Sequence, residues 1–165
     1  MDNANLLLGN SALAVAIPLI WHEAELLDRK AYTEWLELWS IDGHYVVPID
    51  PNAEDFAATL NYVYDDQEMR EKRVQRMTSG YSASASDAAR TVRTVSRFTS
   101  NGQHGDLIEV RSTQMVMAYK RGTTTLFGAD LTHRLRLTDG RVRIVEKVVR
   151  LIEANEALSA IGFLL

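Results

Sequence analysis

The fold is decided by residues 107–152, which read LIEVRSTQMVMAYKRGTTTLFGADLTHRLRLTDGRVRIVEKVVRLI. Apolar and polar residues alternate along much of this stretch, and alternation is the period of a β-strand with one buried face. Gly122 marks one turn, and Asp139-Gly140 between apolar runs is a strong signal for a tight hairpin. We therefore predict three long antiparallel strands at 107–120, 124–137 and 142–152.

The alternation also assigns faces to side chains. In the first strand, one face carries Ile108, Val110, Val116 and Ala118, and the other carries Met115, Met117 and Tyr119. In the second strand, His133 shares a face with Leu131 and Leu135, so we expect its ring to point into the core.

Shorter elements precede these strands. Residues 22–40 are expected to be helical, because the apolar residues Ala24, Leu27, Ala31, Trp35 and Leu38 recur at helical spacing. Asp28 could cap a second short helix at 29–39, and Gly43 is expected to end the helical region. Further strands are predicted at 44–49, 60–64 and 91–99, and a charged helix at 65–79.

Helices followed by long antiparallel strands indicate the α+β class. We predict one domain, residues 1–165, in which the N-terminal helices pack on one face of a strongly curved, mainly antiparallel sheet. Strands this long in a small domain must twist and curl, which gives the sheet the shape of a cone.

Composition excludes several kinds of site. The chain has no cysteine, which removes disulfides, thiolate nucleophiles and zinc or iron–sulfur sites built on cysteine, and which fits a cytoplasmic protein. The net charge of −4 hides an asymmetry, since residues 1–68 hold 13 acidic and two basic residues while the rest of the chain is basic. No nucleic-acid recognition motif accompanies the basic part, so we expect the two parts to pack on each other or on a partner.

The apolar stretch Leu6–Trp21 could be a membrane or signal segment, or it could be part of the buried core. It lacks the basic region that precedes a signal sequence, and Asn10, Ser11 and Pro18 interrupt it before it reaches the length of a membrane span. We expect an N-terminal arm that runs into a buried helix.

Motifs for independent chemistry are scarce. There is no glycine-rich phosphate loop and no GxSxG nucleophile motif, and the four histidines show no close pairing typical of metal ligands. The best catalytic candidates are the group Asp42, His44, Tyr45, His104 and His133, in which a histidine oriented by an aspartate could act as a general base. The candidates for contacts with other subunits are Trp39, Arg90, Arg93 and Arg97, since tryptophan and arginine are enriched at interfaces.

One segment is specific enough to suggest a family. Residues 23–38 read EAELLDRKAYTEWLEL and are followed by Asp42, Tyr45 and Pro48, which resembles a pattern in the β subunits of bacterial aromatic-ring-hydroxylating dioxygenases. Weaker likenesses follow at residues 65–76, 90–93 and 135–147, so the resemblance spans nearly the whole chain.

The resemblance implies a cone-shaped fold like that of nuclear transport factor 2 and scytalone dehydratase. It also implies an α subunit that holds a Rieske 2Fe-2S cluster and a mononuclear iron, in an α3β3 hexamer that cis-dihydroxylates an aromatic compound. In such a complex the β subunit is mainly structural and holds no catalytic, cofactor-binding or metal-binding residues of its own.

Two other functions stay open at this point. The chain could be an independent dehydratase or isomerase that uses an Asp–His pair inside the cone, which requires Asp42 or His44 to meet His133 across an open pocket. It could also be a small-molecule-binding or scaffolding domain without chemistry.

Overall fold

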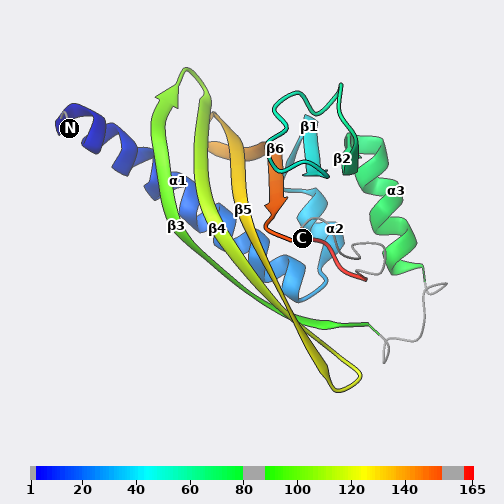
Figure 1. Ribbon diagram of the computed structural model, residues 1–165. Coiled ribbons are helices and arrows are strands. Elements are labelled where there is room, and N and C mark those ends of the chain that lie inside the picture. The colour runs from blue at the N-terminus through cyan, green and yellow to red at the C-terminus, as the bar shows by residue number, and fades with distance from the viewer. Residues whose placement is uncertain (1–2, 80–87, 154–161) are drawn as a thin grey trace.

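The computed structural model describes residues 3–79, 88–153 and 162–165 (Figure 1). The elements follow in the order α1 (Asn3–Asp28), α2 (Tyr32–Leu36), β1 (Trp39–Pro48), β2 (Asn61–Asp65), α3 (Gln67–Thr78), β3 (Arg90–His104), β4 (Leu107–Lys120), β5 (Thr123–Thr138) and β6 (Arg141–Leu151). The strands form a sheet in the order β2-β1-β6-β5-β4-β3, in which only the β1–β6 pair is parallel. The predicted α+β class is confirmed.

Helix α1 crosses one face of the sheet, behind the long twisted strands in Figure 1. Its buried residues are spaced three or four apart, as an amphipathic helix requires. They are Ala12, Ala16, Ile20, Glu23 and Leu27, with Leu26 also buried beside the last of them. We call the face of the sheet that α1 covers the inner face. Among the described residues, no helix is long and apolar enough to cross a membrane.

The strands alternate as the sequence predicts. Ile108, Val110, Val116 and Ala118 of β4 are buried, whereas Met115, Met117 and Tyr119 on the other face are exposed. The hairpin at Asp139-Gly140 is also confirmed, with φ angles of 52° and 72° that suit the tight turn type favoured by Asp-Gly. The register of β4, β5 and β6 therefore follows directly from the burial pattern.

Two local predictions are wrong. The helical region ends at Leu36, and Gly43 lies inside β1, where a Cβ atom would stand 3.0 Å from the carbonyl oxygens of both Ser40 and Ile144. Asp28 does not cap α2, because the N-cap residue is Ala31 and no side chain bonds there. Asp28 instead ends α1 and binds β3, as described below.

Candidate functional site

The centre of the inner face holds a buried carboxylate with three donors. Glu23 of α1 accepts hydrogen bonds from Trp35 Nε1 and Lys147 Nζ, both at 3.0 Å to Oε1, and His133 Nε2 lies 2.9 Å from Oε2. The side chains of Glu23, His133 and Lys147 are at most 2% exposed. Because a carboxylate only accepts, His133 carries a proton on Nε2.

The surroundings of Glu23 keep it ionised. Burial alone raises the pKa of the carboxyl, but the charge of Lys147 and the hydrogen bonds from His133 and Trp35 outweigh it and hold that pKa well below its usual value. This buried group is therefore a closed ion pair in which every carboxylate oxygen has a protein partner, and it ties α1 to β5 and β6.

A second ion pair, between buried Arg93 and partly exposed Asp28, joins the end of α1 to β3. Asp28 accepts hydrogen bonds from the backbone nitrogen of Arg93 at 2.8 Å, from the Arg93 guanidinium at 2.5 Å and from Thr91 Oγ1 at 2.8 Å. The Arg93 side chain is fully buried. Arg93 was predicted as a contact to another subunit, and this stays a prediction, while the structure shows its guanidinium bound inside the chain.

The last described segment, Phe163–Leu165, fills the space beside these two pairs. Tyr45 Oη donates to the backbone oxygen of Leu165 at 3.2 Å, and Lys147 Nζ donates to the same oxygen at 3.0 Å. Arg93 donates to the backbone oxygen of Leu164. Burial raises the pKa of Tyr45, so its hydroxyl stays protonated and able to donate.

The candidate catalytic residues are divided between the two faces of the sheet. Tyr45 points inward, so its neighbour His44 points outward, where its ring stacks on Tyr64 at 5.3 Å. Asp42 is also outward and forms an ion pair with Arg136 at 2.9 Å. His104 is exposed at the end of β3. The sheet therefore separates Asp42 and His44 from His133, and the Asp–His pair is not assembled.

Arg70 of α3 explains the position of Trp39. The Arg70 guanidinium lies 4.3 Å from the centre of the Trp39 ring and donates to the backbone oxygens of Gly43 and Asp65. Trp39 is 6% exposed. Its role as a contact to another subunit stays a prediction, and the structure shows that the ring is covered by the chain itself. Sequence analysis missed Arg70, whose place on a charged helix gives no sign of burial.

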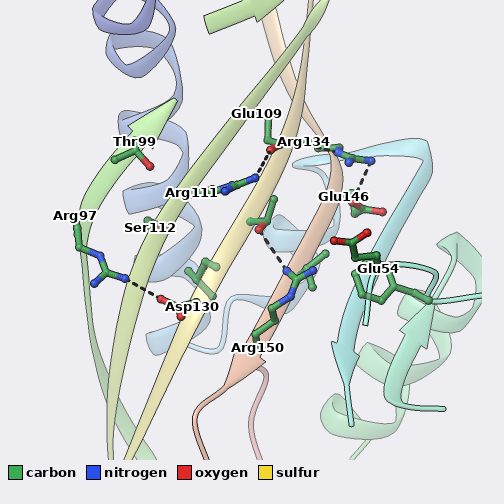
Figure 2. Close-up of a pocket in the computed structure, with 14 residues that line it drawn as sticks. Glu54, Arg97, Thr99, Glu109, Arg111, Ser112, Asp130, Arg134, Glu146 and Arg150 are labelled. Atoms are coloured by element: carbon green, nitrogen blue, oxygen red, sulfur yellow. Dashed lines mark hydrogen bonds and ion pairs between the residues drawn. The ribbon is translucent and has the colours of Figure 1, made fainter. Parts of the chain in front are cut away.

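The outer face of the sheet carries a groove lined by paired charges (Figure 2). Arg97 pairs with Asp130 at 2.9 Å, and Arg134 lies 3.2 Å from Glu109 and 3.5 Å from Glu146. Arg150 donates to the backbone oxygens of Pro51 and Ala53, which fastens the β1–β2 loop to the same face. The predicted contact residue Arg97 thus lies at a surface, as does Arg90, which is exposed at the start of β3.

Farther along the same outer face, the charged residues give way to an apolar strip. Val92 pairs with Met117, and Met117 with Leu126, so side chains of three adjacent strands lie in one row. The strip consists of Val92, Met115, Met117, Tyr119, Leu126 and Ile152, which are 44–73% exposed. The alternation of β4 placed three of these residues on this face, but sequence analysis did not recognise them as a surface patch.

Among the described residues, no three histidine, aspartate or glutamate side chains come together in a way that could hold a metal ion. The acidic side chains on the inner face, Glu23 and Asp28, are each bound to basic groups instead.

Comparison with known proteins places this arrangement in a family. The family model described as "Ring hydroxylating beta subunit" matches residues 22–155. The small oxygenase component of the p-cumate 2,3-dioxygenase system of Pseudomonas putida is 32% identical over 131 residues, which cover 78% of this chain and 73% of that protein. The N,N-dimethyl phenylurea N-demethylase subunit beta of a Sphingobium species is 28% identical over 152 residues, which cover 87% of this chain and 85% of that protein.

A solved structure agrees in fold. The β subunit of benzoate 1,2-dioxygenase from Burkholderia mallei aligns with a TM-score of 0.76 at 23% identity, covering 92% of this chain and 97% of that one. The predicted cone of the nuclear transport factor 2 type is confirmed. The chain belongs to the ring-hydroxylating β-subunit family. The β subunit of a ring-hydroxylating dioxygenase that the resemblance implied is confirmed, and the alternative of an independent dehydratase or isomerase is not favoured.

Proposed function

We propose that this chain assembles as a trimer within an α3β3 oxygenase, in the cytoplasm, and supports an α subunit that holds a Rieske cluster and a mononuclear iron. The α subunit then performs cis-dihydroxylation of an aromatic compound. The names of the relatives support a larger oxygenase partner, since one is called a small oxygenase component and another a subunit beta.

The observation that carries this proposal is the contrast between an interior filled by the chain itself and an outer face with exposed apolar side chains. Inside, Lys147 donates to Glu23 and to the backbone oxygen of Leu165, and Arg93 donates to the backbone oxygen of Leu164. Outside, the apolar strip leaves side chains such as Met117 and Leu126 in solvent. A contiguous apolar patch on a soluble protein is typical of a contact surface, so we assign the strip to a neighbouring subunit of the assembly.

Co-expression with a Rieske-type α subunit tests the proposal. We expect the two chains to purify together, with a mass by light scattering that corresponds to three copies of each. Product analysis should follow both ring dihydroxylation and N-demethylation, because the relatives carry names of both kinds. A strictly monomeric chain that leaves its α subunit unbound would contradict the proposal.

A matched pair of variants tests the strip. Met117→Lys places a charge in the centre of the strip and should reduce the fraction of assembled complex. Leu60→Lys is the control, because Leu60 is 80% exposed outside the strip and before β2. Both variants should fold with unchanged melting temperatures. Equal assembly of the two variants would remove the strip from the contact surface.

A further inference from the structure

The segment Phe163–Leu165 contacts the cone as a bound peptide contacts its receptor. It belongs to no helix or strand, yet its three side chains are at most 7% exposed. Strands hold each other by backbone pairing, whereas the polar backbone atoms of this segment are held by side chains. These side chains come from three separate strands, namely Tyr45 of β1, Arg93 of β3 and Lys147 of β6.

The hydrogen bonds hold the backbone of the segment at two successive residues. Tyr45 Oη binds Leu165 twice, since it donates to the backbone oxygen at 3.2 Å and accepts from the backbone nitrogen at 3.1 Å. Lys147 adds a second donor to the Leu165 oxygen at 3.0 Å, and Arg93 donates to the Leu164 oxygen. Two successive backbone oxygens are thereby held by three buried donors, and this is the small set of placed polar groups that marks a ligand site.

Both cations already have a carboxylate partner. Lys147 Nζ lies 3.0 Å from Glu23, and the Arg93 guanidinium lies 2.5 Å from Asp28. A buried cation that is already neutralised needs no further anion, but it still has N–H groups that must be hydrogen-bonded. The backbone oxygens of Leu164 and Leu165 satisfy these donors.

The walls around the segment are apolar and aromatic. The Phe163 ring packs edge-on against Phe127 of β5 with a centroid distance of 5.6 Å, and the Arg93 guanidinium lies 5.9 Å from the Phe163 ring. The same core cluster contains Leu164 and Leu165. The site therefore selects apolar side chains as well as backbone oxygens.

We propose that the interior of the cone is a peptide-binding site, that Phe163–Leu165 is its resident ligand, and that a separate short peptide with the same apolar side chains can replace this segment. The proposal does not depend on the α partner, because every contact that carries it lies within this chain. Its ligand class is a short apolar peptide, recognised through two neighbouring backbone oxygens.

Exchange of the segment after folding tests this directly. A protease recognition sequence introduced within residues 154–161 allows the full chain to fold first and to be cut afterwards. A fluorescent Gly-Phe-Leu-Leu peptide is then added to the cut protein. We expect saturable binding that excess unlabelled peptide reverses, and no binding of a Gly-Ser-Ser-Ser peptide. Failure of the labelled peptide to enter, or equal binding of the serine peptide, would overturn the proposal.

Tyr45→Phe in the cut protein identifies the site that the peptide occupies. This variant removes both hydrogen bonds to Leu165 and should weaken peptide binding about tenfold. Tyr64→Phe is the matched control, because Tyr64 is 42% exposed on the outer face and stacks on His44, and it should bind the peptide as the unmodified chain does. Equal affinity of the two variants would place the peptide elsewhere and overturn the proposal.

As a second measurement, a chain without Phe163–Leu165 should melt at a lower temperature, and the Gly-Phe-Leu-Leu peptide should raise it again. An unchanged melting temperature on deletion would also overturn the proposal. If the deleted chain does not fold, the cut protein still decides the question, because that protein folds before its segment is released.

Discussion

The two faces of the sheet carry the same kinds of charges in opposite environments. Glu146 and Lys147 are adjacent on β6 and therefore point to opposite faces. Glu146 pairs outside with Arg134, whose side chain is 52% exposed, while Lys147 pairs inside with Glu23, where both are at most 2% exposed. Both contacts are ion pairs between a carboxylate and a basic side chain. Burial makes their contributions to folding stability different.

The importance of an ion pair for stability depends on the free-energy cost of losing one of its partners. Water replaces the missing partner on the outer face at little cost. On the inner face, a lone charge cannot reach water, so removal of its partner leaves an uncompensated buried ion. The inner pairs therefore commit α1 to its position, whereas the outer pairs leave the groove free to rearrange.

The largest effect is expected for Lys147→Met. The change leaves ionised Glu23 without its cation and should lower the free energy of unfolding by about 3–5 kcal/mol. Urea denaturation followed by tryptophan fluorescence measures this. The double variant Glu23→Gln/Lys147→Met should recover part of the loss, because it removes both charges together. A loss below about 1 kcal/mol for the single variant would make the inner pair equivalent to an outer one.

Asp28→Asn should have the next largest effect. It leaves the buried guanidinium of Arg93 without a counter-charge, and we expect a loss of about 3 kcal/mol in the free energy of unfolding. The matched control is Asp130→Asn, which removes the partner of the exposed Arg97 and should cost at most about 1 kcal/mol. Urea denaturation of both variants makes the comparison, and equal losses would show that burial does not separate the two pairs.

Acid should weaken the inner face through Glu23. Its pKa is lower in the folded chain than in the unfolded chain, so the carboxylate stabilises the fold above the ordinary value of 4.5 and loses that contribution as the pH falls below it. The difference in free energy of unfolding between the unmodified chain and Glu23→Gln should therefore shrink between pH 6 and pH 3, as denaturation at several pH values will measure. A constant difference would contradict this assignment.

The smallest effect is expected for Arg134→Gln on the outer face. Arg134 is half exposed and bridges Glu109 and Glu146, so its removal should change the free energy of unfolding by at most about 1 kcal/mol. Denaturation at low and high salt checks this, since screening should abolish even that small difference. A larger loss that persists in high salt would show that the outer pairs also hold the sheet.

Much of the fold could be predicted because its strands alternate cleanly. Ile108 and Met115 were assigned to opposite faces of β4 from periodicity alone, and the Asp139-Gly140 turn fixed the register of the next pair. His133 was also placed correctly in the core. These are local patterns, and local patterns are visible in one sequence.

The residues that were misplaced form contacts between distant parts of the chain. Asp28 was interpreted as a helix cap, yet its partner Arg93 lies 65 residues away. Arg93 and Trp39 belong to types that are common at interfaces, and nothing local indicated that Asp28 and Arg70 would cover them. Lys147 gave one usable signal, because it shares a strand face with Val149 and Leu151, and a lysine on an apolar face needs a buried partner.

The separation between Glu23 and Lys147 has a consequence for how the protein is made. Their side chains meet across 124 residues, so α1 leaves the ribosome long before its counter-charge has been synthesised. Contacts between residues so far apart close late and slow the search for the native state. We expect the apolar stripe of α1 to stay uncovered until β6 emerges from the ribosome. Nascent chains that end before Lys147 should therefore depend on chaperones to stay soluble.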